Sequence, residues 1–329
     1  MPETINVYLG IDLGGTKIAA AAVDVRTGER QVQLVVPTEA HEGPPAVITR
    51  IASLVDRVCD QANLRREHVP AIGVGVPGVI DPSSGTTLLL PNLPSGWRGV
   101  PLVAEMQRLT GRPTAIINDA RAFTLAEAVF GAGRGMHSVV GMTLGTGIGG
   151  GIAIDGRLYL GLDGTAGEIG HMTIDPNGAP CGCGNRGCLE TFASGPSITA
   201  MGLRAVAQGM TTQIGELVEY DLNKITPEII MRAADNGDGV AREILQRAGS
   251  YLGVGVANLI TILSPDRVVI GGGVSRLGEW ILGPVHAEIL KRCHVTPLNR
   301  VQVVPAQLGG EAGVIGAAVW AAQTSGTWH

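Results

Sequence analysis

The sequence predicts an α/β protein made of two related lobes. Short β-type runs alternate with amphipathic helical runs along most of the 329 residues, which is the order typical of α/β folds. Two glycine-containing hairpins, at 7–23 and 139–154, also align with a constant offset, which pairs Gly10 with Gly141 and Asp24 with Asp155. A repeated hairpin indicates two lobes of one plan and therefore a cleft between them. Chance similarity of two glycine-rich hairpins is the alternative.

The remaining elements follow from hydrophobic periodicity. Val47 and Ile51 recur at helical spacing, for example, so their segment is expected to be an amphipathic helix. The same reasoning predicts helices at 45–62, 101–110, 120–130, 240–263, 280–292 and 312–322. It predicts strands at 71–76, 114–117, 267–270 and 301–304. We expect the smaller lobe to comprise 1–118 and about 311–329, and the larger lobe to comprise 119–310.

Composition and charge narrow the function classes. Hydrophobic residues make up 45% of the chain and charged residues 16%, which is enough apolar surface for a sizeable core. The formal net charge of -5 argues against a nucleic-acid partner. The sequence has no apolar run of membrane-spanning length and no evident signal peptide. We therefore expect a soluble, cytoplasmic protein without a membrane partner, and its apolar helices would permit a homodimer or homotetramer.

Three of the five cysteines are clustered in the sequence. Cys181, Cys183 and Cys188 follow His171 in the pattern H-x9-C-x-C-x4-C. Three thiolates and one imidazole match a closed tetrahedral zinc shell, which leaves no position for a reactive water. The sequence therefore predicts a structural Zn²⁺ site, and reduced cysteines that bind no metal are the alternative. The two isolated cysteines are interpreted as ordinary core or surface residues.

The first glycine turn, Asp12 to Lys17, is a candidate phosphate site. Gly14 and Gly15 have no side chain, so backbone N–H groups can approach an anion closely. Thr16 can add a hydroxyl and Lys17 a positive charge, while Asp12 can hold Mg²⁺ directly or through water. The segment lacks the spacing of a Walker loop, and no helix follows it directly. An ordinary hairpin turn is the alternative.

Two further glycine runs are candidate nucleotide-binding turns. Gly145, Thr146 and Gly147 form the turn of the second hairpin. Strand-like residues follow them, so a dinucleotide-binding fold is not expected. Gly272 and Gly273 lie between a predicted strand and a predicted helix, where backbone groups can meet a nucleotide. Plain turns are the alternative for both runs.

A carboxylate at the end of a predicted strand is the candidate catalytic group. Asn118 and Asp119 follow the strand 114–117 and precede a helix, which is where open α/β folds bind ligands. An aspartate there can accept a hydroxyl proton, and an asparagine can orient the hydroxyl. The alternative for Asp119 is a helix N-cap.

Polar residues elsewhere are candidate sugar ligands. Glu168 and His171 form the motif E-I-G-H, and Glu190 follows the cysteine cluster closely. Carboxylates can bind vicinal sugar hydroxyls, and Asn92, which lies between turn-forming residues, can add a further contact. The alternative for the two glutamates is that they are ordinary surface acids.

These motifs together resemble those of the ROK family (repressor, open reading frame, kinase). The resemblance extends from about Val7 to Ala321. The segments that carry it are Asp12 to Lys17, Leu144 to Gly151, Glu168 to His171 and Cys181 to Glu190. It implies an actin-like, two-lobed sugar-kinase fold of the ribonuclease H-like type. It also implies phosphorylation of a hexose at its 6-hydroxyl by ATP and Mg²⁺, with glucose as the expected sugar.

The resemblance also implies roles for single residues. Asp119 would be the general base. The hexose ligands would be Asn92, Asn118, Asp119, Glu168, His171 and Glu190. The ATP phosphates would lie against Gly14, Gly15, Thr16 and Lys17 with Asp12 beside them, and against Gly145, Thr146 and Gly147. The adenosine would lie near Gly272, Gly273 and Val274.

Other members of the family provide the alternatives. A kinase for mannose, N-acetylmannosamine or fructose would carry the same motifs, and so could a sugar-sensing regulator that no longer transfers phosphate. Family repressors have an N-terminal DNA-binding helix-turn-helix, whereas only six residues precede the first predicted strand here. We therefore expect an enzyme with no nucleic-acid partner. One departure from the family pattern is Glu311, where relatives often have a shorter acid.

Overall fold

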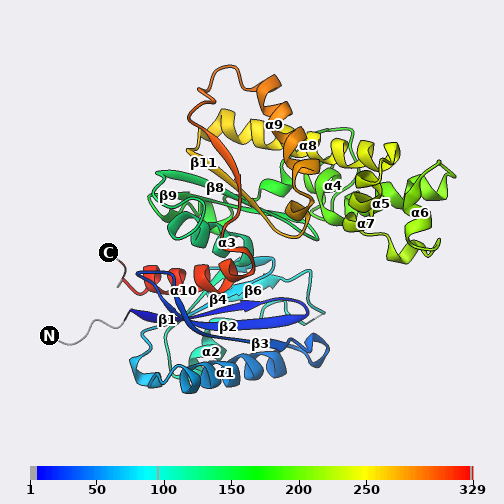
Figure 1. Cartoon of the computed structure of the whole chain (residues 1–329). Coiled ribbons are helices and arrows are strands. Elements are labelled where there is room, and N and C mark those ends of the chain that lie inside the picture. The colour runs from blue at the N-terminus through cyan, green and yellow to red at the C-terminus, as the bar shows by residue number, and fades with distance from the viewer. Residues whose placement is uncertain (1–5, 95, 327, 329) are drawn as a thin grey trace. The chain divides into compact units, whose positions relative to one another are not determined.

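The computed structural model describes residues 6–94, 96–326 and 328, and it divides into two compact α/β units (Figure 1). The first unit comprises the described residues up to Gly135, residues 152–166 and the described residues from Gln307 onward. The second unit comprises Met136–Gly151 and Gly167–Ala306.

A five-stranded sheet in the order β3-β2-β1-β4-β7 forms the centre of the first unit. β1 and β3 run antiparallel to β2, whereas β1, β4 and β7 are parallel to one another. The strands are β1 (Val7–Leu13), β2 (Lys17–Asp24), β3 (Arg30–Pro37), β4 (Ile72–Val76) and β7 (Thr114–Asn118). The central strands are buried on both faces and are continuous apolar runs, as expected of a sheet that is covered on both sides.

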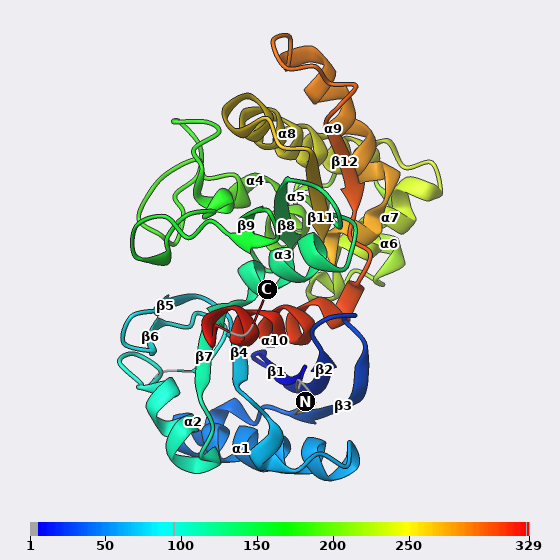
Figure 2. The same ribbon diagram turned by 90° about the vertical axis from the view of Figure 1, so that its left-hand side faces the viewer.

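Helices cover the two faces of this sheet (Figures 1 and 2). α1 (Pro44–Gln61) and α2 (Leu102–Thr110) lie on one face, and α10 (Ala312–Thr324) lies on the other. The backbone of α10 touches the sheet, because a Cβ on Gly10 would lie 1.8 Å from the carbonyl oxygen of Val314. A Cβ on Gly73 would lie 1.8 Å from that of Ala317. Only glycine fits at both strand positions.

α3 (Asp119–Val129) packs closely against α10. A Cβ on Gly316 of α10 would lie 1.8 Å from the carbonyl oxygen of Ala122, so the two helices are in backbone contact. This packing places 119–135 in the first unit rather than with the residues expected in the larger lobe. Residues 152–166 and 307–310 also belong to the first unit.

A short ribbon completes the first unit. β5 (Val79–Asp81) and β6 (Thr86–Leu89) pair antiparallel and follow β4 in the chain.

A second five-stranded sheet has the order β10-β9-β8-β11-β12. Its strands are β8 (Ser138–Leu144), β9 (Ile148–Ile154), β10 (Arg157–Leu158), β11 (Arg267–Gly271) and β12 (Gln302–Pro305). β11 is parallel to both β8 and β12, and β10 is antiparallel to β9. Three consecutive strands followed by two parallel ones is also the plan of the first sheet, so the hairpin repeat of the sequence corresponds to a repeated topology.

Helices dominate the rest of the second unit. They are α4 (Glu190–Ala193), α5 (Gly195–Ala207), α6 (Gln213–Leu217), α7 (Pro227–Asp235), α8 (Gly239–Leu263) and α9 (Glu279–Arg292). α8 packs closely against α9, since a Cβ on Gly249 of α8 would lie 2.7 Å from the carbonyl oxygen of Ile281 of α9. Among the described residues, no helix combines the length and the apolar character needed to cross a bilayer.

Candidate active site

Asp12 lies at the carboxyl end of β1, where the first turn begins. Its carboxylate approaches the first turn of α10, since a Cβ on Gly313 would lie 2.6 Å from Asp12 Oδ2. Burial raises the pKa of the Asp12 carboxyl above its ordinary value, and the positive charge of Lys17 opposes this effect. The structure therefore places an acid and a lysine at opposite ends of one glycine turn.

The turn itself is held by backbone and hydroxyl contacts. The amide of Gly14 donates to the carbonyl of Lys17 at 2.9 Å, and the Thr38 hydroxyl donates to the carbonyl of Gly14 at 2.7 Å. A Cβ on Gly15 would lie 2.4 Å from the backbone oxygen of Asn92. The structure thus brings the turn and Asn92 together, and both Thr16 and Lys17 are exposed beside them.

Asn118 and Asp119 lie at the same edge of the first sheet as Asp12, because β1, β4 and β7 are parallel. Asn118 is the N-cap of α3, since its Oδ1 accepts from the amides of Ala120 at 3.0 Å and Arg121 at 3.2 Å. Its Nδ2 donates to the carbonyl of Gly78 at 2.9 Å. The capping role that the sequence left open for Asp119 therefore belongs to Asn118.

Asp119 is the first residue of α3 and is half-buried. Its Oδ1 accepts from the amide of Ala120 at 2.8 Å. Gly75 of β4 lies between this helix and the first turn. A Cβ there would be 4.0 Å from Asp12 Oδ1 and 3.9 Å from Ala122 Cβ. The two candidate carboxylates are thus held by adjoining elements of one unit.

The second glycine turn follows β8 in the second unit. The amide of Gly145 donates to the carbonyl of Gly147 at 2.9 Å, and the amide of Gly195 donates to the carbonyl of Gly145 at 2.9 Å. A Cβ on Gly147 would lie 2.9 Å from Glu190 Oε2. The structure therefore brings this turn, with its exposed Thr146, together with a predicted sugar ligand.

The third glycine run packs against the end of β8. Gly272 has a φ of +90°, and a Cβ on it would lie 2.3 Å from the carbonyl oxygen of Leu144. Gly273 precedes a 3-10 turn that begins at Val274. Val274 lies near the second turn, because a Cβ on Gly195 would be 3.1 Å from the carbonyl oxygen of Gly145 and 3.6 Å from a methyl group of Val274.

His171 and the three clustered cysteines converge in the second unit. The ligand atoms of His171, Cys181, Cys183 and Cys188 all lie within 4.8 Å of one another. Cys181 Sγ is 3.6 Å from His171 Nδ1, and Cys183 Sγ is 3.7 Å from Cys188 Sγ. Ordinary zinc bond lengths in a tetrahedron separate a nitrogen and a sulfur by about 3.6 Å and two sulfurs by about 3.8 Å. The four side chains therefore fit the zinc motif that their spacing predicted.

Glu190 lies directly beside this cluster. Its Oε1 is 2.9 Å from Cys181 Sγ and 3.5 Å from His171 Nδ1. Glu168 is exposed and precedes the 3-10 turn Ile169–His171, and the amide of His171 donates to its carbonyl at 3.1 Å. Three of the predicted sugar ligands, Glu168, His171 and Glu190, are therefore grouped in the second unit, whereas Asn92, Asn118 and Asp119 belong to the first.

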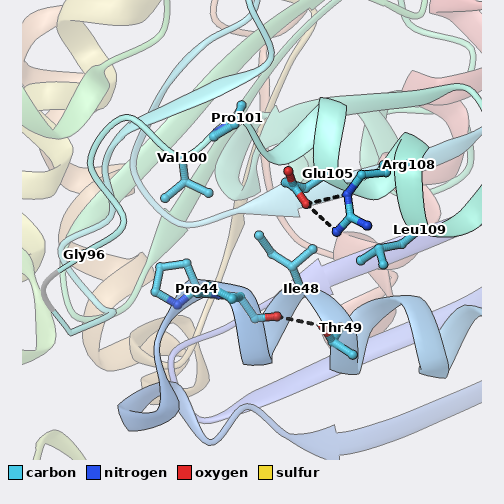
Figure 3. A pocket seen from close by; sticks show the side chains of 10 residues that line it. Pro44, Ile48, Thr49, Gly96, Val100, Pro101, Glu105, Arg108 and Leu109 are labelled. Carbon is cyan, nitrogen blue, oxygen red and sulfur yellow. Dashed lines mark hydrogen bonds and ion pairs between the residues drawn. The ribbon is translucent and has the colours of Figure 1, made fainter.

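A separate cavity of about 380 Å³ lies between α1 and α2 (Figure 3). Pro44, Ile48, Val100 and Leu109 form its apolar wall. The Glu105–Arg108 ion pair on α2 lines it as well. None of the predicted site residues lines this cavity.

Sequence reasoning missed two buried charged residues on α3, Arg121 and Glu127. The Arg121 guanidinium donates to the carbonyl of Ala166 at 3.1 Å. Glu127 accepts hydrogen bonds from three backbone amides. The sequence signal that could have found Glu127 is a single acid within the otherwise apolar run from Leu125 to Phe130.

A family model described as the ROK family matches residues 8–324. The chain belongs to the ROK family. It is similar to a glucokinase of Thermotoga maritima, with 38% identity over 94% of this chain and 95% of that protein. It is also similar to a xylose repressor of Caldicellulosiruptor bescii, with 33% identity over 95% of this chain and 77% of the repressor.

A solved ROK structure has the same fold. The structure of a ROK family glucokinase from Streptomyces griseus in complex with glucose and AMPPNP matches with a TM-score of 0.79 and 35% identity. The match covers 96% of this chain and 99% of that one. The protein therefore has the actin-like α/β fold of ROK sugar kinases that the resemblance implied, and it contains two five-stranded sheets.

Proposed function

We propose that this ROK protein is a glucokinase, which transfers the γ-phosphoryl group of ATP to the 6-hydroxyl of glucose. The observation that carries the proposal is Asp119, a half-buried carboxylate at the carboxyl end of β7 and at the start of α3. The similarity to a glucokinase of Thermotoga maritima and to a structure that contains glucose and AMPPNP supports the choice of substrates.

Asp119 would act as the general base. Its Oδ1 is oriented by the amide of Ala120, and the cap of α3 is already supplied by Asn118. Asp119 is therefore not required as the cap. In the proposed step its carboxylate accepts the proton of the 6-hydroxyl while that oxygen attacks the γ-phosphorus and ADP leaves. Such base catalysis contributes about 10²- to 10⁴-fold to rate.

Two of the proposed sugar ligands, Asn118 and His171, each have an atom that can contact a hydroxyl group. Asn118 has one amide hydrogen bonded to Gly78, which leaves its second N–H to donate to a hydroxyl. His171 directs Nδ1 toward the cysteines, so Nε2 is the atom assigned to the sugar. Glu168, Glu190 and Asn92 would accept or orient further hydroxyl groups.

We propose zinc as the metal of the His171 and cysteine cluster. A bound Zn²⁺ would cross-link the segment between His171 and Cys188 and so fix its conformation. Glu190 lies 2.9 Å from Cys181 Sγ, and His171 itself belongs to the cluster. The same cross-links would therefore set the positions of two sugar ligands.

The phosphates of ATP would be bound by the two glycine turns. Backbone amides of Gly14 to Thr16 and of Gly145 to Gly147 can donate to phosphate oxygens, and Lys17 adds a positive charge. Asp12 would hold Mg²⁺ beside the first turn. The adenosine would lie near Gly272, Gly273 and Val274, which adjoin the second turn.

The test of this function is ADP release with ATP as donor and a panel of glucose, mannose, fructose and N-acetylmannosamine. We expect the largest kcat/KM with glucose. A larger kcat/KM with another sugar would identify that sugar, rather than glucose, as the substrate. Polyphosphate should be tested in parallel as the phosphoryl donor. Release of no ADP above the sugar-free rate with any member would overturn the kinase assignment.

A sugar-responsive regulator without transfer activity is the second candidate. The similarity to a xylose repressor, at 33% identity, is the observation that favours it. Calorimetry with xylose and glucose, together with the ADP-release assay, separates the two functions. Sugar binding without turnover identifies a regulator, whereas turnover identifies a kinase.

A further inference from the structure

Among the described acids of the first unit, Glu127 is the most deeply buried, with 0% of its surface exposed. Its Oε2 accepts from the amide of Ala132 at 2.8 Å. Its Oε1 accepts from the amides of Gln307 at 3.0 Å and Leu308 at 2.7 Å. A buried carboxylate must be compensated by donors, and here the donors come from two segments that are far apart in sequence.

These hydrogen bonds join two helices of the first unit. Glu127 belongs to α3, whereas Gln307 and Leu308 lead into α10. The two helices also touch through Gly316 and the carbonyl oxygen of Ala122. The Glu127 carboxylate thus fastens the carboxyl-terminal half of α3 to the segment that enters α10.

α10 in turn rests on the strand that carries Asp12. Gly10 of β1 allows backbone contact with Val314, and Gly313 lies against the Asp12 carboxylate. The path from Glu127 through α10 to β1 therefore consists of backbone contacts and hydrogen bonds, all inside one unit. These contacts leave little freedom for α3 to shift along its axis relative to Asp12.

We propose that Glu127 is a positioning residue for Asp119, which rests on the proposed function. Asp119 is the first residue of α3, and Glu127 lies just over two turns further along the same helix. A displacement at one end of a helix is transmitted to the other end. A shift of α3 by one residue along its axis would therefore move Asp119 by about 1.5 Å. A misplacement of about 1 Å at a reacting group costs about 10²-fold in rate.

The first experiment replaces the carboxylate by an amide, Glu127→Gln. In either orientation the amide nitrogen faces a backbone donor, that of Ala132 or those of Gln307 and Leu308. At least one hydrogen bond is therefore lost and the others lose the carboxylate charge, while the side-chain volume is kept. We expect kcat for glucose phosphorylation to fall about 10- to 100-fold, while the Kd for glucose, measured by calorimetry, stays within about twofold of wild type. Glu105→Gln on α2, a half-buried acid paired with Arg108, is the matched control and should keep the wild-type kcat.

A second pair of variants tests the same bonds from the donor side. Leu308 has a φ of -83°, close to the range that proline adopts. Leu308→Pro removes the N–H that donates to Glu127, whereas Leu308→Ala keeps it and removes only the side chain. We expect Leu308→Pro to lower kcat without weakening glucose binding, and Leu308→Ala to remain close to wild type. If circular dichroism shows that Glu127→Gln is unfolded, the two Leu308 variants test the positioning role in its place.

The outcomes separate this proposal from the proposed function. Wild-type kcat in both Glu127→Gln and Leu308→Pro, with an active parent, overturns the positioning role and leaves the kinase assignment standing. A parallel loss of kcat and glucose affinity, or an equal loss in Glu105→Gln or Leu308→Ala, also overturns it, because a general loss of structure would then explain the result. An inactive wild-type protein overturns both proposals.

Discussion

The two hairpin turns occupy equivalent places in two sheets of one topology, yet each is held against a different kind of atom. Gly15 of the first turn lies against the backbone oxygen of Asn92, whereas Gly147 of the second lies against the side-chain carboxylate of Glu190. The first turn also carries charge, through Asp12 and Lys17, while the second is formed by glycines and Thr146. Each candidate phosphate turn thus contacts a candidate sugar ligand of its own unit. The contact of the first turn is with backbone, which cannot easily move, and that of the second turn is with a side chain, which can rotate away.

The largest effect is expected at Asp119, which belongs to the first unit. Asp119→Asn keeps the shape of the side chain and removes the proton acceptor. We expect kcat for glucose phosphorylation to fall by about 10²- to 10⁴-fold, with a glucose Kd close to wild type. Single-turnover kinetics and calorimetry measure the two quantities. Retention of the wild-type kcat would show that the first unit does not supply the base.

Metal removal acts on the second unit and gives the next effect. Chelation of the proposed Zn²⁺ frees the segment that carries His171 and ends beside Glu190. We expect the glucose Kd to rise about 10- to 100-fold, because a hydrogen bond to a charged group contributes about 1.5–3 kcal/mol. The Kd for AMPPNP should change by less than about threefold, because the glycine turns contain no metal ligand. Metal analysis before and after chelation provides the control. An equal loss of affinity for glucose and AMPPNP would contradict the proposal that the metal positions the sugar ligands but not the phosphate-binding turns.

The two turn glycines give the sharpest comparison. In Gly147→Ala the new methyl group meets the movable Glu190 carboxylate, so we expect the glucose KM to rise several-fold with little change in Tm. In Gly15→Ala it meets backbone at 2.4 Å, so the Tm should fall as well, since an overpacked contact costs about 1–3 kcal/mol. Thermal melts and steady-state kinetics on both variants test this. Equal changes in Tm would remove the distinction between a rigid and an adjustable contact.

The smallest effect is expected at the turn between β5 and β6, where the side chain of Asp81 holds the backbone. Asp81 accepts hydrogen bonds from the amides and hydroxyls of Ser83 and Ser84, which lowers the pKa of the Asp81 carboxyl to about 2. A lowered pKa stabilises the folded state above the unfolded pKa of about 4, and this contribution disappears as the pH falls from about 4 to 2. The Tm difference between wild type and Asp81→Asn should therefore be small at neutral pH and vanish near pH 2. A difference that persists at that pH would contradict the assignment.

The sequence predicted elements whose signal is local. The helix expected at 45–62 is observed at Pro44–Gln61, and the long helix expected at 240–263 is observed at Gly239–Leu263. The cysteine pattern identified a cluster whose geometry fits a metal. β3, the short β5–β6 ribbon and α5 were not predicted, because their hydrophobic patterns are short or interrupted by glycine and polar residues.

Contacts between distant segments were beyond the reach of the sequence. Nothing in the residues around Gly15 indicates Asn92 as its neighbour, and nothing near Glu127 indicates Gln307. Sequence reasoning considered only Asp119 as the N-cap, although asparagine is as favoured a cap as aspartate. The end of β7 decides between the two, because the strand extends to Asn118 and α3 begins immediately afterwards.

The position of α10 has a consequence for synthesis of the chain. This helix covers one face of the first sheet, whose strands are all translated well before Ala312. Chains emerge from the ribosome amino end first, and domains tend to fold as they emerge. One face of the first sheet, including its glycine-containing strands, therefore stays uncovered until α10 has been synthesised. The strands and helices of the second unit are synthesised before α10. A nascent chain stalled before α10 would present an uncovered apolar sheet, the kind of surface that chaperones bind.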